Sequence, residues 1–188
     1  MLNVKASSVL ALVVVAVLGM SACSSDAEPS SATSDPTATT IGLIQGVQTY
    51  TGLERNHTSD PVDYPQSPPV GGNHNPVWQN CGVYDTPVAD GNAVHSLEHG
   101  AVWLAYRTDL PADQVAVLAA FAVNQTHVLV SPYPGLENAV TATAWGVQLT
   151  LDSVTDPRLA QFVEKYQEGP QTPELGVTCS GGTGDPIS

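Results

Sequence analysis

The sequence predicts a single α+β domain, in which about two helices cover one face of an antiparallel or mixed sheet. Three observations lead to this class. Apolar runs of strand length recur between residues 101 and 151, segments with helix-compatible apolar spacing lie at 111–124 and 156–169, and a long loop-rich segment precedes them. The predicted order of elements is β-α-β-β-α, whereas the order of the strands in the sheet does not follow from the sequence.

The loop-rich segment covers residues 57–92, which contain many prolines and turn pairs such as Asp60-Pro61 and Asn75-Pro76. Stretches of this length without regular structure are usually functional or disordered. Because this one carries the large aromatic side chains of Trp78 and Tyr84, we expect it to be ordered.

The first regular elements are two strands with a helix between them. Residues 101–106 (AVWLAY) form a continuous apolar run that predicts a central strand. Residues 111–124 begin with a proline, which suits the first turn of a helix, and have apolar spacing compatible with one. Residues 127–131 (HVLVS) predict a second strand that ends before Pro132.

Residues 140–151 predict a further strand whose apolar pattern changes phase. Apolar residues occupy even positions from Val140 to Ala144 and odd positions from Val147 to Leu151. Gly146 lies at the change, where a β-bulge would move the buried face by one residue.

The last predicted helix begins with Asp156 and Pro157, a favourable pair for the N-cap and first helical positions. The apolar residues that follow recur at i, i+3, i+4 and i+7, which is typical of an amphipathic helix, and the helix is expected to end near Gly169. These apolar residues are Leu159, Phe162, Val163 and Tyr166.

The N-terminus has the features of a secretory signal peptide over residues 1–22: Lys5, an apolar run near 9–18, and small residues before Cys23. A cysteine in this position is typical of a lipobox and predicts diacylglycerol on Cys23. The alternative is an uncleaved signal anchor with an incidental cysteine. We expect a disordered linker over 23–40, a globular domain over 41–179 and a flexible tail over 180–188. The lipid anchor would hold the protein at the extracytoplasmic face of the cell membrane.

Net charge limits the possible partners. Cleavage after residue 22 would remove Lys5 and no acidic residue, which leaves 4 basic and 18 acidic residues. Such an acidic chain is not expected to bind nucleic acid or anionic lipid through a basic patch. The membrane, reached through the lipid, is the predicted partner, and a protein or small-molecule partner does not follow from the sequence.

The remaining two cysteines, Cys81 and Cys179, form an even pair in an oxidising compartment, which predicts one disulfide. It would close a loop of about 100 residues and hold the C-terminal region against the middle of the domain. The alternative is a pair of free thiols that bind a metal.

Four of the five histidines, His57, His74, His95 and His99, lie in or beside the loop-rich segment. If residues 94–99 are helical, the side chains of His95 and His99 share a face and could bind one cation. We expect His74 to supply a third nitrogen, so that His74, His95 and His99 bind the ion and His57 or Glu98 completes the site. Imidazole ligands suit zinc or copper, and the only two methionines precede Cys23, so we expect a zinc or copper ion rather than a thioether site.

Two other functions remain open. The string His95-Ser96-Leu97-Glu98-His99 matches the H-x-x-E-H pattern of some metallopeptidases, which would make Glu98 the catalytic base of a metal-dependent hydrolase. Alternatively, the protein is a metal-free envelope binding or scaffold protein in which the histidines form structural hydrogen bonds.

Four blocks of the sequence resemble a bacterial family known as domain of unknown function 3105, whose members are typically secreted or membrane-anchored. The blocks are 68–74 (PPVGGNH), 82–85 (GVYD), 94–102 (VHSLEHGAV) and 144–146 (AWG). The resemblance covers roughly residues 50–168. His74 matches a histidine of the family pattern, although the residues just before it differ from that pattern. His57 corresponds to a histidine that lies upstream in the family. The resemblance implies no activity, but it implies that the four histidines and Glu98 belong together.

Overall fold

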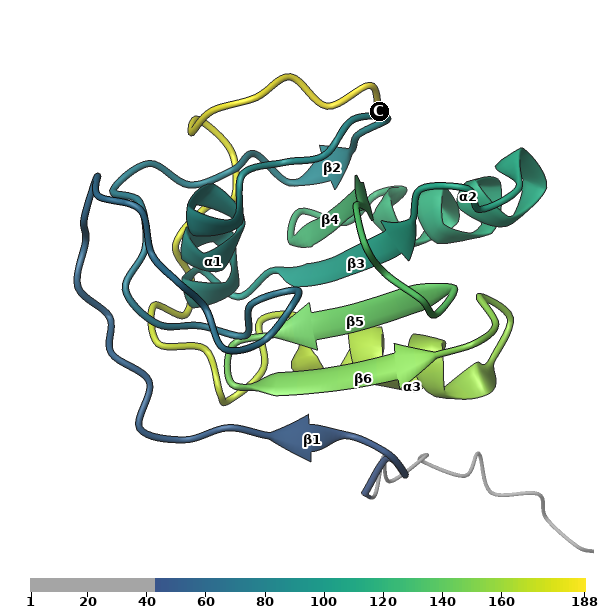
Figure 1. Ribbon diagram of the computed structural model, residues 1–188, viewed down its shortest axis with the longest axis horizontal. Coiled ribbons are helices and arrows are strands. Elements are labelled where there is room, and N and C mark those ends of the chain that lie inside the picture. Colours follow the sequence, from purple (N-terminus) through teal and green to yellow (C-terminus); the bar gives the residue numbers. More distant parts are fainter. Residues whose placement is uncertain (1–42) are drawn as a thin grey trace, which may run out of the picture. The chain divides into compact units, whose positions relative to one another are not determined.

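The computed structural model describes residues 43–188. These residues form one mixed six-stranded sheet with helices packed against it (Figure 1). The predicted signal peptide and Cys23, and the predicted linker, lie outside the described residues. The elements are β1 (Gln48–Thr49), β2 (Gly82–Val83), α1 (Asp90–Glu98), β3 (Val102–Arg107), α2 (Ala112–Ala119), the 3-10 turn η1 (Ala120–Ala122), β4 (Val128–Tyr133), β5 (Val140–Ala144), β6 (Val147–Leu151) and α3 (Pro157–Tyr166).

The strands lie in the order β1-β6-β5-β3-β4-β2. β3 and β4 are parallel and are connected through α2, and β2 pairs with β4 in the same direction. β5 pairs with β3, β6 with β5, and β1 with β6, all antiparallel. The sheet is therefore mixed, which confirms the predicted α+β class.

Helices cover both faces of the sheet. Along β3, Leu104 belongs to a core formed with Leu118 of α2 and Phe162 of α3. The residue before it, Trp103, points to the opposite face and belongs to a second core that contains Leu97 of α1. Two helices thus pack on one face, as predicted, while α1 packs on the opposite face and brings its residues to the loop-rich side of the molecule.

The change of phase in residues 140–151 has a different cause from the predicted bulge. β5 and β6 are separate strands joined by a tight turn at Trp145 and Gly146, with Val140 opposite Leu151 and Ala144 opposite Val147. Gly146 has a φ of 69°, a conformation that favours glycine. In this register the two apolar series face the same core, so the even-to-odd change marks a hairpin and not a bulge.

α3 begins as predicted. Asp156 is its N-cap and accepts a hydrogen bond of 2.9 Å from the backbone N–H of Arg158, with Pro157 in the first turn. The helix ends at Tyr166, three residues before the predicted end. The other predicted helix is shorter than 111–124, because α2 changes to the 3-10 turn η1 at Ala120.

The C-terminal segment runs past α1 and ends beside β2 (Figure 1). A disulfide joins Cys81 to Cys179 across a sequence separation of 98 residues. Residues 180–188, expected from the sequence to form a flexible tail, donate and accept backbone hydrogen bonds with residues 78–83. These bonds satisfy polar groups at the edge of β2. Within residues 43–188, every helix is too short or too polar to cross a membrane.

Candidate metal centre

Helix α1 presents three of the candidate residues. His95 and Glu98 belong to its last turn, and His99 is its C-cap. The helix ends there because Gly100 has a φ of 103°, which a residue with a side chain adopts only with strain. Ser96 points in another direction and donates a hydrogen bond of 2.6 Å to the carbonyl of Gln79, which fixes the loop against the helix.

The loop-rich segment brings the other two histidines to the helix. The backbone N–H of His74 donates to the carbonyl of Asn56 (3.1 Å), and the carbonyl of His74 accepts from Thr58 (2.7 Å). These bonds form a parallel bridge between His57 and His74, so the two side chains lie next to each other. The prediction that this segment is ordered agrees with these contacts.

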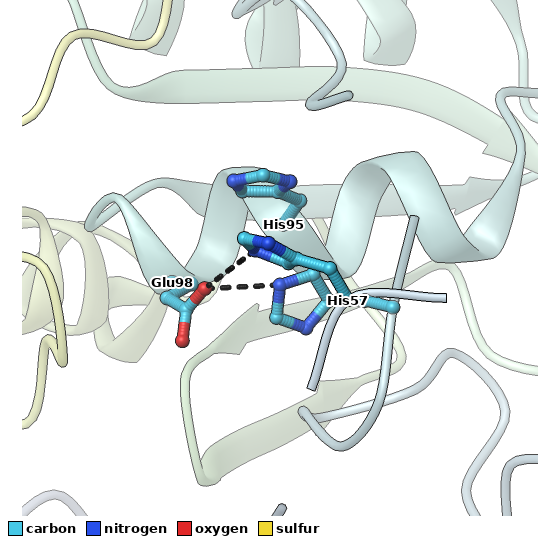
Figure 2. Close-up of side chains that lie close together, drawn as sticks. His57, His95 and Glu98 are labelled. Carbon is cyan, nitrogen blue, oxygen red and sulfur yellow. Dashed lines mark ion pairs between the residues drawn. The ribbon is translucent and has the colours of Figure 1, made fainter. Parts of the chain in front are cut away.

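Side-chain atoms of His57, His74, His95 and Glu98 converge on one point. Their potential ligand atoms all lie within 4.8 Å of one another. The Oε2 atom of Glu98 is 2.9 Å from Nε2 of His74 and 3.8 Å from Nε2 of His57. Ligand atoms on a tetrahedral zinc ion lie about 3.3 Å apart, given metal–ligand bonds of about 2.0–2.1 Å. Figure 2 shows His57, His95 and Glu98 in this arrangement.

The orientation of two imidazole rings suits metal binding. Nδ1 of His74 lies 2.8 Å from the carbonyl of Gly72, and Nδ1 of His95 lies 2.7 Å from the carbonyl of Asn75. A carbonyl only accepts hydrogen bonds, so each Nδ1 carries the proton and each neutral ring has its lone pair on Nε2. Hydrogen bonds of this kind commonly hold histidine ligands in place around a metal.

A proton or a metal ion between the side chains of His74 and Glu98 would stabilise their close contact. Nε2 of His74 is buried and has no hydrogen-bond partner, although Oε2 of Glu98 lies 2.9 Å away. With the proton on Nδ1, a nitrogen lone pair faces a carboxylate oxygen, which is unfavourable unless a proton or a metal ion lies between them. The side chain of Glu98 is only 3% exposed, and a buried negative charge is costly without such a partner.

His99 belongs to a different group of ligand atoms. It lies with His95 and Glu174, and its Nε2 atom is 3.6 Å from Oε2 of Glu174. Sequence reasoning did not identify Glu174, because no local motif surrounds it. The backbone N–H of Glu174 donates to the carbonyl of Glu98 (3.0 Å), so the residue reaches the site through the path of the C-terminal segment.

The site is accessible from one side. An open depression of about 560 Å³ lies beside both groups of potential ligands. It is lined by the carboxylate of the first group, Glu98, and by that of the second, Glu174. The side chains of His57 and Glu174 are 47% and 44% exposed, whereas those of His74 and His99 are almost completely buried. An ion could therefore enter from solvent without a large rearrangement.

Burial favours the neutral form of the imidazoles of His95 and His99. It lowers the pKa of His95 from its ordinary value of 6.5 to about 4, and nearby histidines lower it further while the hydrogen bond to Asn75 opposes the shift. Burial also lowers the pKa of His99, although the bond to Thr178 and the charge of Glu174 oppose this. At neutral pH both rings are unprotonated, which is the form that binds metals.

The low pKa of His95 predicts that the metal-free protein loses stability in acid. Between pH 6.5 and about 4 the unfolded chain binds a proton at this residue and the folded chain does not, so the free energy of unfolding falls as pH falls. The loss should reach about 3 kcal/mol near pH 4, at about 1.4 kcal/mol per pKa unit. Urea unfolding of the wild type and of His95→Gln at several pH values measures it. A pH dependence equally steep in the variant would contradict the assignment to His95.

The fold and site together define an α+β domain with a cluster of histidine and glutamate side chains at one end of a short helix. The chain belongs to the family described as "Protein of unknown function (DUF3105)", whose model matches residues 56–181. The match includes all five predicted metal ligands, but not Cys23. No curated protein and no solved structure matches the chain.

Proposed function

We propose that this protein is an exported lipoprotein, anchored through Cys23 at the extracytoplasmic face of the cell membrane, whose domain binds a zinc or copper ion. The observation that carries the metal proposal is the convergence of His57, His74, His95 and Glu98 within 4.8 Å. The lone pairs on Nε2 of His74 and His95, directed by backbone carbonyls, support it.

The donor set favours particular metals. Three imidazole nitrogens and one carboxylate oxygen suit Zn²⁺ or Cu²⁺, whereas Ca²⁺ and Mg²⁺ prefer oxygen ligands. Both methionines precede Cys23 and the described cysteines form a disulfide, so soft sulfur ligands for Cu⁺ are absent from residues 43–188. Four protein ligands complete a tetrahedral shell, which favours holding a metal over catalysis.

A metal-dependent hydrolase is the second candidate. The observation that favours it is that Glu98 lines the open depression, where it could act as a base on metal-bound water if the three histidines alone held the ion. The metal-free scaffold is the third candidate. It would assign the histidine rings to the hydrogen bonds made by their Nδ1 atoms.

Elemental mass spectrometry tests the metal proposal directly. The full chain, purified without a histidine tag, is expected to retain close to one zinc or copper ion per chain, or to take one up on refilling and keep it through a wash. No retained ion after exposure to both metals would rule out the metal site and the hydrolase, and would leave the scaffold.

Metabolic labelling with a fatty acid tests the anchor. The wild-type chain should carry the label, whereas Cys23→Ala should carry none. Equal labelling of the two chains would show that Cys23 is not the lipidated residue.

A further inference from the structure

The second group of ligand atoms, His95, His99 and Glu174, is not used by the proposed site. Nδ1 of His99 lies 2.8 Å from the carbonyl of Thr178, so this ring, like that of His95, has its lone pair on Nε2. The rings of His95 and His99 meet edge to face with centroids 4.6 Å apart. Trp78 packs against both rings, which are buried.

From this arrangement we infer an outer position for the metal ion, bound by Nε2 of His95, Nε2 of His99 and the carboxylate of Glu174. The inference rests on the proposed function, because it concerns the same ion. The inner position is the one formed by His57, His74, His95 and Glu98. Two imidazoles and one carboxylate form a known type of three-ligand zinc site that leaves a fourth position open.

The inner and outer positions are occupied in turn and not together. His95 belongs to both groups, and its Nδ1 atom is already committed to the carbonyl of Asn75. Its single free nitrogen, Nε2, therefore binds one ion at a time. The chain holds one ion, which moves between the two positions while His95 stays bound to it.

The surroundings make the outer position a second route of exchange with solvent, beside the route past the inner ligand His57, whose side chain is 47% exposed. Glu98 and Glu174 line the same depression, and the side chain of Glu174 is 44% exposed while that of Glu98 is 3% exposed. An ion arriving from solvent meets an exposed carboxylate, then the buried ring of His99, and reaches the inner ligands through His95. With three ligands against four, the outer position binds more weakly and releases its ion faster.

The protein contains a matched control for Glu174. Glu168 faces His127 at 3.5 Å and its side chain is 40% exposed, while Glu174 faces His99 at 3.6 Å and is 44% exposed. His127 is also buried, and it bonds to the carbonyl of Val177. The pair His127–Glu168 belongs to neither group of potential ligands in the described chain. Glu168→Gln thus makes the same chemical change at a carboxylate outside both groups of potential ligands.

The first experiment measures Zn²⁺ binding to the full chain after removal of the inner ligands. His57→Ala/His74→Ala is expected to bind one zinc ion per chain, more weakly than the wild type. Adding Glu174→Gln should lower the remaining affinity by about 10-fold or more, whereas adding Glu168→Gln should leave it unchanged. Circular dichroism checks that each variant is folded. Absence of zinc from the folded double variant would overturn the outer position.

The second experiment keeps the inner ligands and measures rates. Zinc uptake, and zinc loss to an excess of chelator, should both be several-fold slower in Glu174→Gln than in the wild type, and unchanged in Glu168→Gln. Equal rates in the two variants would overturn the exchange route even if the double variant above failed to fold. A wild type that binds no zinc would overturn the proposed function. A wild type that binds zinc at rates that do not change in Glu174→Gln would overturn only the exchange route.

Discussion

Replacing His74 by alanine is expected to lower the affinity for Zn²⁺ by about 100-fold or more. Loss of residues that merely support a metal ligand typically costs about 10–100-fold, and His74 would be a ligand itself. Its Nε2 atom is buried and lies 2.9 Å from Glu98, so the variant also leaves that carboxylate without its nearest partner. A factor of 100 corresponds to about 2.7 kcal/mol of binding free energy. Isothermal titration or competition with a chelator measures the change.

His127→Ala is the control for this prediction. His127 is a buried histidine that bonds to a backbone carbonyl, as His74 does, but it lies in neither group of potential ligands. Its replacement should change stability and leave zinc affinity nearly unchanged. Equal affinities in the two variants would mean that the histidine cluster is not the binding site.

Removing the disulfide with Cys81→Ser/Cys179→Ser is expected to lower the free energy of unfolding by about 4–5 kcal/mol. The bond closes a long loop, with a sequence separation of 98 residues, and the chain-entropy model gives about this value for such a loop. Urea unfolding of the double variant and of the wild type, both without metal, measures the difference.

The same variant should also bind zinc less tightly at the outer position. The carbonyl of Thr178, next to Cys179, holds the ring of His99, and the segment before it carries Glu174. The wild type treated with a reductant should reproduce the behaviour of the variant. A loss of stability below about 1 kcal/mol would show that the backbone hydrogen bonds between residues 78–83 and the C-terminal segment suffice to hold it.

Much of the architecture could be predicted because it depends on local patterns. Asp156 and Pro157 begin α3 through capping chemistry that involves neighbouring residues only. The apolar run at 101–106 is a central strand because it is buried on both faces, between α1 and the other two helices. The hairpin at Gly146 was misread as a bulge, since both produce the same change of phase along the sequence.

The sequence by itself determined the α+β class, the residue types of the potential metal ligands and the placement of His95 and His99 one helical turn apart. The tertiary structure alone decided how these ligands are grouped. His57 and His74 meet through backbone hydrogen bonds between distant parts of one loop, and Glu174 joins His99 because the C-terminal segment bonds to the end of α1. Such contacts depend on the path of loops whose hydrogen bonds link residues far apart in the chain. The periodic patterns of the sequence do not predict the path of these loops, so only the folded structure shows which ligands come together.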